Sequence, residues 1–188
     1  MFLAAQVKFM KAIVRMIDQM NEWLGKAASW LLLPLVLIVC FDVVARKLFN
    51  FSRIWIMDLE WHLFALIFLL AAGYTLKHNR HVRVDLFYDK FEKKEKGQVD
   101  FFGSLIFLLP WSIIVLIYTF DYAAQSLAMN EGASEPGGLP ARYLIKFAVP
   151  IAIFMLLLQG LSLMYKAWLA MRGDEDQIEA KTESPAEE

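Results

Sequence analysis

The sequence contains little of the chemistry on which most enzymes and metalloproteins depend. It has a single cysteine, Cys40, and three histidines. One cysteine can form neither a disulfide within the chain nor a cysteine-based metal site. A glycine-rich phosphate loop, a zinc-ligand spacing and a basic–aromatic nucleic-acid pattern are also missing. These absences argue against an enzyme, a cofactor-binding protein and a partner of nucleic acids.

Charge is missing from several long hydrophobic stretches, although 21% of all residues are charged. Crossing the ~30 Å hydrocarbon core of a bilayer takes about 20 apolar residues in a helix. Four stretches reach or approach this length, and we predict membrane spans at about residues 27–45, 57–76, 101–120 and 144–168. The predicted fold class is therefore an all-α integral membrane protein with four transmembrane helices. Pro34 and Pro110 are expected to kink their spans.

The remaining segments are polar or amphipathic. Residues 1–26 combine an apolar stripe with a basic face and lack the cleavage site of a secretory signal. We expect a helix that lies on the membrane surface, with packing on the soluble face of a partner as the alternative. Residues 77–98 are predicted to form a basic amphipathic segment on the cytoplasmic leaflet. Residues 169–188 are acidic and lack aromatic residues, which predicts a disordered tail.

The basic residues predict the orientation of the chain. Fourteen of the nineteen Lys and Arg residues fall on the side that carries the N-terminal segment, residues 77–98 and the C-terminal end. Cytoplasmic loops of membrane proteins carry an excess of Lys and Arg. We therefore expect a multi-pass protein of the bacterial cytoplasmic membrane with both termini in the cytoplasm.

Two polar residues stand out inside predicted spans. Asp42 is the only charged residue of the first span, and Arg46 follows one turn later. An ion pair of Asp42 with Arg46 or with a neighbouring helix is expected, with ion or proton handling as the alternative. Gln159, next to Gly160 in the last span, is expected to form a hydrogen bond where two helices pack closely.

The second predicted span begins with polar turns. Asp58, Glu60 and His62 precede a run of only fourteen uncharged residues, 63–76, so their side chains must face protein or the interface. Asp58 and His62 are four residues apart and could pair. Glu60 points toward a neighbouring helix or subunit, or is a solvated interfacial carboxylate. Trp55 fits the aromatic belt at the membrane surface.

The four spans contain too little polarity to form a transport path of their own. Secondary transporters generally use internal repeats and broken helices around a site at the middle of the bilayer. Here Gln159 is almost the only polar residue at that depth. The composition therefore indicates a helper subunit that docks on a larger membrane protein. A free-standing tetraspan organiser of the membrane and an anchor subunit of another complex, including a redox complex, are the alternatives.

Several short motifs follow one another in an order that resembles a known family. They are Arg46-Lys47-Leu48-Phe49-Asn50, then Trp55, Glu60 and Gly73, then His81-Val82-Arg83-Val84-Asp85, then Gly137-Gly138-Leu139-Pro140, Pro150 and Gln159-Gly160. The order resembles the DctQ-like family, the small permease subunits of TRAP (tripartite ATP-independent periplasmic) transporters. The likeness covers roughly residues 27–168.

The resemblance implies a role in secondary active transport. A periplasmic substrate-binding protein would deliver an organic acid or related solute to a large permease subunit, which imports it by symport, typically with sodium. The small subunit would scaffold the large one and help dock the binding protein, without binding solute, metal or cofactor itself. Arg46 and Glu60 on the outer side are structural or interface candidates that could pair within this subunit or across to the large one. Arg83 and Asp85 on the cytoplasmic side, where they could fix the turn after the second span, are further candidates, together with Asp42, Trp55 and Gln159.

Overall fold

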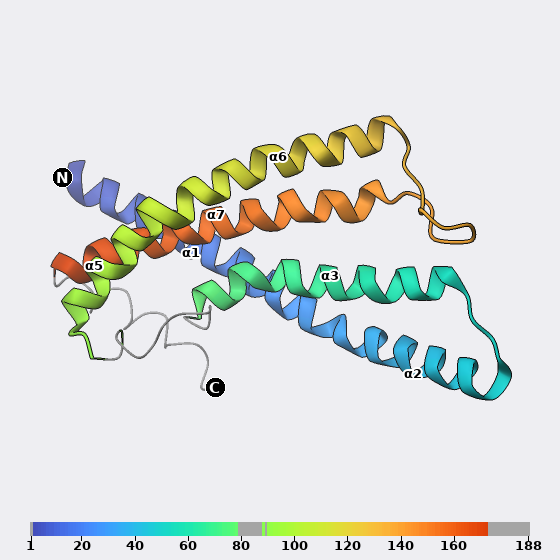
Figure 1. Ribbon diagram of the computed structural model, residues 1–188. Helices are drawn as coiled ribbons and strands as arrows, with labels where there is room; N and C mark the ends of the chain where they lie inside the picture. Colours follow the sequence, from blue (N-terminus) through green and yellow to red (C-terminus); the bar gives the residue numbers. More distant parts are fainter. Residues whose placement is uncertain (1, 79–87, 89, 173–188) are drawn as a thin grey trace.

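The computed structural model of the chain describes residues 2–78, 88 and 90–172 (Figure 1). Four of its helical segments are long and apolar enough to cross a membrane, and the described residues contain no strand. The predicted all-α membrane fold is therefore confirmed. The elements are α1 (Phe2–Trp30), α2 (Leu32–Phe49), α3 (Ile54–Lys77), α5 (Lys93–Gly103), a π-helical turn (Ser104–Leu108), α6 (Leu109–Ala128) and α7 (Tyr143–Arg172).

The last helix, α7, is the centre of the bundle. It packs against α6, α5, α3 and α1, and Figure 1 shows it between α6 and α3. In its most apolar stretch, 44% of the residues are buried, against at most 11% in the other candidate spans. Small residues allow the close approach of α6, because Ser112 and Ala123 are fully buried and a side chain at Gly160 would collide with Leu108.

Both prolines that were expected to disturb helices lie beside irregular turns. The helical run from α1 to α2 is interrupted at Leu31, three residues before Pro34. A proline ring clashes with the carbonyl group four residues earlier, which here belongs to Trp30. Between α5 and α6, the π-helical turn Ser104–Leu108 ends two residues before Pro110. Pro110 has no backbone N–H, so one helical hydrogen bond is missing here, and the wider π-helical turn lies just before this position.

The N-terminal helix α1 is tied to the bundle. It packs against α3 and α7, runs into α2, and buries Val14, Ile17 and Ala28. Its predicted place on the membrane surface stays a prediction. Of the predicted basic segment 77–98, residues 79–87 and 89 lie outside the described residues, and a capping box of Glu92 and Glu95 begins α5. The predicted tail lies outside the described residues from residue 173 onward.

Different elements lie at the two ends of the bundle. We call the end that holds the N-terminus the inner end and the opposite end the outer end, after the orientation that the basic residues predict. At one end lie the N-terminus, the last turn of α3, the start of α5 and the end of α7 (Figure 1). At the other end lie the α2–α3 turn and the loop between α6 and α7. Asn50 ends α2 in the left-handed conformation that asparagine tolerates better than most residues.

Gly73 marks the closest approach of α1 and α3. A Cβ atom at this position would collide with the side-chain oxygen of the buried Asn21. We predict that Gly73→Ala lowers the free energy of unfolding by about 1–3 kcal/mol, the range for overpacked interiors. Gly103→Ala is the matched control, because no atom lies within 4 Å of its would-be Cβ. The control should raise helix stability by about 0.5–1 kcal/mol. Thermal unfolding in detergent measures both, and equal shifts would contradict the close contact.

Candidate functional site

A carboxylate on α1 is joined to the inner half of α7, from Gln159 at the middle of that helix to Lys166 near its inner end. The Asp18 carboxylate accepts hydrogen bonds from Gln159 Nε2 at 2.9 Å, from Ser162 Oγ at 2.9 Å and from Lys166 Nζ at 2.6 Å. All three donors come from successive turns of α7, so one side chain of α1 binds three turns of its neighbour. Because Asp18 and Lys166 are both largely shielded from solvent, this contact is more than a loose surface pair.

Next to this contact, Asn21 and Gln159 form a buried amide pair. Asn21 Nδ2 donates to Gln159 Oε1 at 2.9 Å and to the Ile17 carbonyl at 3.2 Å. Both side chains are about 99% shielded from solvent. Gln159 therefore lies at a close helix contact and uses its amide oxygen and its amide nitrogen at once, toward Asn21 and Asp18 respectively.

Glu22 is the third polar residue of α1 in this region, and it binds residues at the end of α3. The Glu22 carboxylate accepts a hydrogen bond from Lys77 Nζ at 2.6 Å and lies 2.8 Å from His78 Nε2. Lys26, one turn further along α1, adds an ion pair at 3.2 Å. We call Asp18, Asn21 and Glu22, with the residues that they bind, the inner polar junction. It connects α1 to α7 and to α3.

The outer end of the bundle is joined by Asp58. Its carboxylate accepts a hydrogen bond from the backbone N–H of Leu139 at 2.9 Å and another from Trp61 Nε1 at 3.1 Å. Leu139 belongs to the loop between α6 and α7, so Asp58 attaches this loop to α3. His62 does not bind the Asp58 carboxylate as its spacing suggested. Its Nδ1 instead lies 2.5 Å from the backbone carbonyl oxygen of Asp58.

The same loop has a second attachment at Glu131, which lies outside the membrane spans. Glu131 accepts hydrogen bonds from Lys146 Nζ at 2.5 Å and from Ser126 Oγ at 2.6 Å. The Lys146 ammonium, and then the Ser126 hydroxyl, hold the pKa of the Glu131 carboxyl below its ordinary value. The ammonium of Lys146 also lies 4.0 Å from the ring centroid of Tyr122. We call Asp58 and Glu131, with the residues that they bind, the outer loop clamp.

The structure places the predicted candidates in different surroundings. The guanidinium of Arg46 donates to the carboxylate of Asp42, and Asp42 is 1% exposed. Trp55 is exposed at the start of α3. Glu60 is half-buried, and its buried Oε1 has no hydrogen-bond partner. Arg83 and Asp85 lie outside the described residues. Arg46 is thus paired within its own helix, so the structure does not bring it into an ion pair with Glu60.

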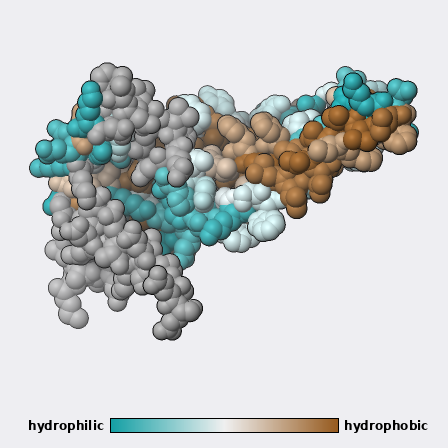
Figure 2. Space-filling model, turned by 90° about the horizontal axis from the view of Figure 1, so that it is seen from below, coloured by the Kyte–Doolittle hydropathy of each residue, from teal (hydrophilic) through white to brown (hydrophobic). Residues whose placement is uncertain are grey.

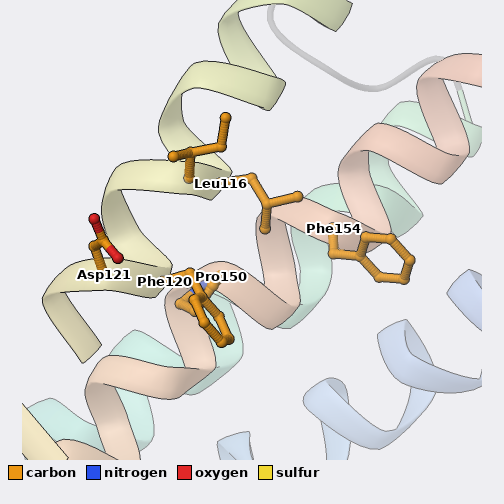
Figure 3. A pocket seen from close by; sticks show the side chains of 6 residues that line it. Leu116, Phe120, Asp121, Pro150 and Phe154 are labelled. Atoms are coloured by element: carbon orange, nitrogen blue, oxygen red, sulfur yellow. The ribbon is translucent and has the colours of Figure 1, made fainter. Parts of the chain in front are cut away.

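Cavities and metal-ligand groups offer little for binding a polar solute. An open hollow between α6 and α7 is lined by Leu116, Ile117, Phe120, Asp121, Pro150 and Phe154 (Figure 3). Its lining is apolar except for Asp121. In the part of the chain that the structure describes, no three His, Cys, Asp or Glu side chains gather where they could hold a metal ion.

The fold and its polar contacts define a multi-pass helical membrane protein whose polar side chains fasten helices and a loop to one another. The family model of the DctQ component of tripartite ATP-independent periplasmic transporters matches residues 35–170. Because the match covers well over half of the chain, the chain belongs to this family and is a small subunit of a TRAP transporter. A comparison with curated proteins gave no match.

Asp18 gives the first test of the inner polar junction. Asp18→Ala removes the shared acceptor of Gln159, Ser162 and Lys166. We expect it to lower the free energy of unfolding in detergent by about 1–3 kcal/mol, since buried donors lose their partner. The double variant Asp18→Ala/Lys166→Met should lose less than the sum of its single variants. The exposed Asp121→Ala is the control and should change stability little. Additive losses in the double variant would refute the pairing.

The outer loop clamp should depend on pH. A carboxyl whose pKa is lower in the folded than in the unfolded protein stabilises the fold above its unfolded pKa, and this contribution disappears as the pH falls through the folded pKa. We therefore expect the wild type to have a higher free energy of unfolding than Glu131→Gln at pH 7. This difference should shrink as the pH falls below about 4.5, the ordinary pKa of the carboxyl. Thermal unfolding of both proteins across this range measures the difference. A difference that does not change with pH would contradict the role of the Glu131 charge.

Proposed function

We propose that this chain is the rigid scaffold on which the large permease subunit of its TRAP transporter is mounted. The observation that carries the proposal is the isolation of α2. Of its eighteen residues, only Asp42 and Ala45 are buried, and among the described elements α2 packs mainly against α3 and α1. Seen from the side on which α2 lies, the surface over this part of the molecule is continuously hydrophobic (Figure 2).

A helix in this position is well suited to a partner. Lipid tails are as apolar as helix side chains, so membrane helices associate through close packing and hydrogen bonds rather than through hydrophobicity alone. Within the described part of the chain, α2 is covered along one side. A large permease subunit that packs on the remaining sides of α2 would complete its surroundings.

The two polar attachments fit the role of a scaffold. The inner polar junction holds α1 to α7 and α3, and the outer loop clamp holds the α6–α7 loop to α3 and α7. Because these contacts hold the helices of the small subunit together in two places, the bundle resists deformation. The moving transport domain of the large subunit needs such a rigid support. The transport of solute and its coupling to an ion, for which we propose sodium, then take place in the large subunit.

We further propose that the outer loop helps to dock the periplasmic binding protein, which delivers an organic acid or a related solute. The orientation predicted from the basic residues places this loop in the periplasm and both termini in the cytoplasm. Its attachment by Asp58 and Glu131 would present a fixed surface to the incoming protein.

Co-expression of the tagged chain with the large permease from the same gene cluster tests the scaffold role. Val44 lies about 200° around α2 from Asp42, on the side away from α3, and is half exposed. We expect Val44→Trp to reduce co-purification of the permease and solute uptake in proteoliposomes several-fold, because a bulky side chain prevents close packing.

The matched control is Ile114→Trp on the exposed side of α6, which should co-purify and support uptake like the wild type. A chain that purifies as a stable particle without ever retaining the permease would contradict the proposal and favour a free-standing organiser. Translocation of solute by this chain alone would also contradict it.

A further inference from the structure

The exposed side of α3 has the spacing of a helix-packing seam. Met57, Trp61, Phe64 and Phe68 follow one another at intervals of four, three and four residues and are all exposed. In an α-helix, this spacing aligns side chains in one stripe, and such stripes pack against the side chains of a second helix. We call these four residues the α3 seam. An apolar stripe alone could equally well face lipid, so it identifies no partner.

Glu60 distinguishes this stripe from a lipid-facing surface. It lies three residues after Met57 and four residues before Phe64, so its side chain emerges beside the α3 seam. Glu60 is half-buried. Its Oε1 is covered by this chain and has no hydrogen-bond partner, while part of the residue stays accessible from outside the chain. A carboxylate in apolar surroundings is costly unless a donor or a cation accompanies it.

The basic and acidic neighbours of Glu60 are occupied elsewhere. Arg46, on the neighbouring helix α2, donates to Asp42 on its own helix. Arg53, two turns before Glu60, lies over the ring of Phe51. Asp58 lies about 200° around α3 from Glu60 and binds the backbone of Leu139. Among the ion pairs of the described residues, none includes Glu60. The counter-charge is therefore expected from outside this chain.

We propose that Glu60 and the α3 seam form a docking site for one transmembrane helix of the large permease, and that this helix carries a Lys or Arg that pairs with Glu60. The inference rests on the proposed function and adds the chemistry of the partner surface. Glu60 lies six residues into α3, about 9 Å from its outer end. A long basic side chain in the outer part of a membrane helix can reach this depth.

Charge variants of Glu60 test the pairing in the intact complex. Glu60→Gln keeps the size of the side chain and removes its charge, and Glu60→Lys reverses the charge. We expect each to reduce the amount of large permease that co-purifies with the tagged chain by about tenfold or more. Asp121→Lys makes the same charge reversal on the exposed outer part of α6 and should leave co-purification unchanged. Equal yields and elution volumes of the purified small subunits would show that the variants fold.

A rescue experiment identifies the partner residue. Each Lys and Arg in the outer halves of the permease spans is changed to Glu and combined with Glu60→Lys, and one of these reversals should restore co-purification. Normal co-purification of Glu60→Gln would overturn the inference, because a neutral side chain would then suffice. Rescue by none of the reversals would overturn it as well.

The proposed function can be judged separately. If the Glu60 variants behave like the wild type while Val44→Trp loses the permease, the subunit is still a scaffold and only the charged docking site is wrong.

Discussion

The structure depends on hydrogen bonds to carboxylates between helices that are otherwise apolar. In a bilayer, hydrophobicity does not press one helix against another, so small residues and polar contacts decide which helices associate. Asp18 is the centre of this arrangement, because three donors from successive turns of α7 converge on it. Its contacts fix the height and rotation of α1 relative to the central helix. The neighbouring bonds of Asn21 and Glu22 then extend this order to α3.

The polar contacts between elements lie in the inner half of the bundle and at its outer end, and none of them involves α2 among the described residues. In the inner half they join α1, α3 and α7, and at the outer end they join α3 to the loop that precedes α7. Only one side of α2 is covered. The molecule therefore consists of a bundle whose helices are held together by polar contacts and of one helix, α2, that extends from this bundle. This arrangement is suited to a subunit that gives support to another protein.

Hydropathy was enough to predict four helices that are long and apolar enough to cross a membrane, since a span takes about 20 apolar residues. Gln159 was also identifiable, because a lone amide in a long apolar span needs a partner. Asp18 and Asn21 were not identified, because polar residues of an amphipathic helix are usually assigned to water. The signal was their position beside the apolar stripe of Val14 and Ile17. The bond from Leu139 to Asp58 joins residues 81 apart, and no local spacing reveals such a contact.

The break at Leu31 gives the helical run from α1 to α2 one weakened turn at a defined place. On one side of it, α1 is held by the inner polar junction, and on the other side α2 extends toward the opposite end of the bundle (Figure 1). Pro34 removes the hydrogen bond that would stiffen the helix at Trp30. A sideways force on α2 would therefore be absorbed by bending at this point, and α1, α3 and α7 would keep their positions. The rigid part of the scaffold would then be the fastened bundle, and α2 would be the part that yields to the partner.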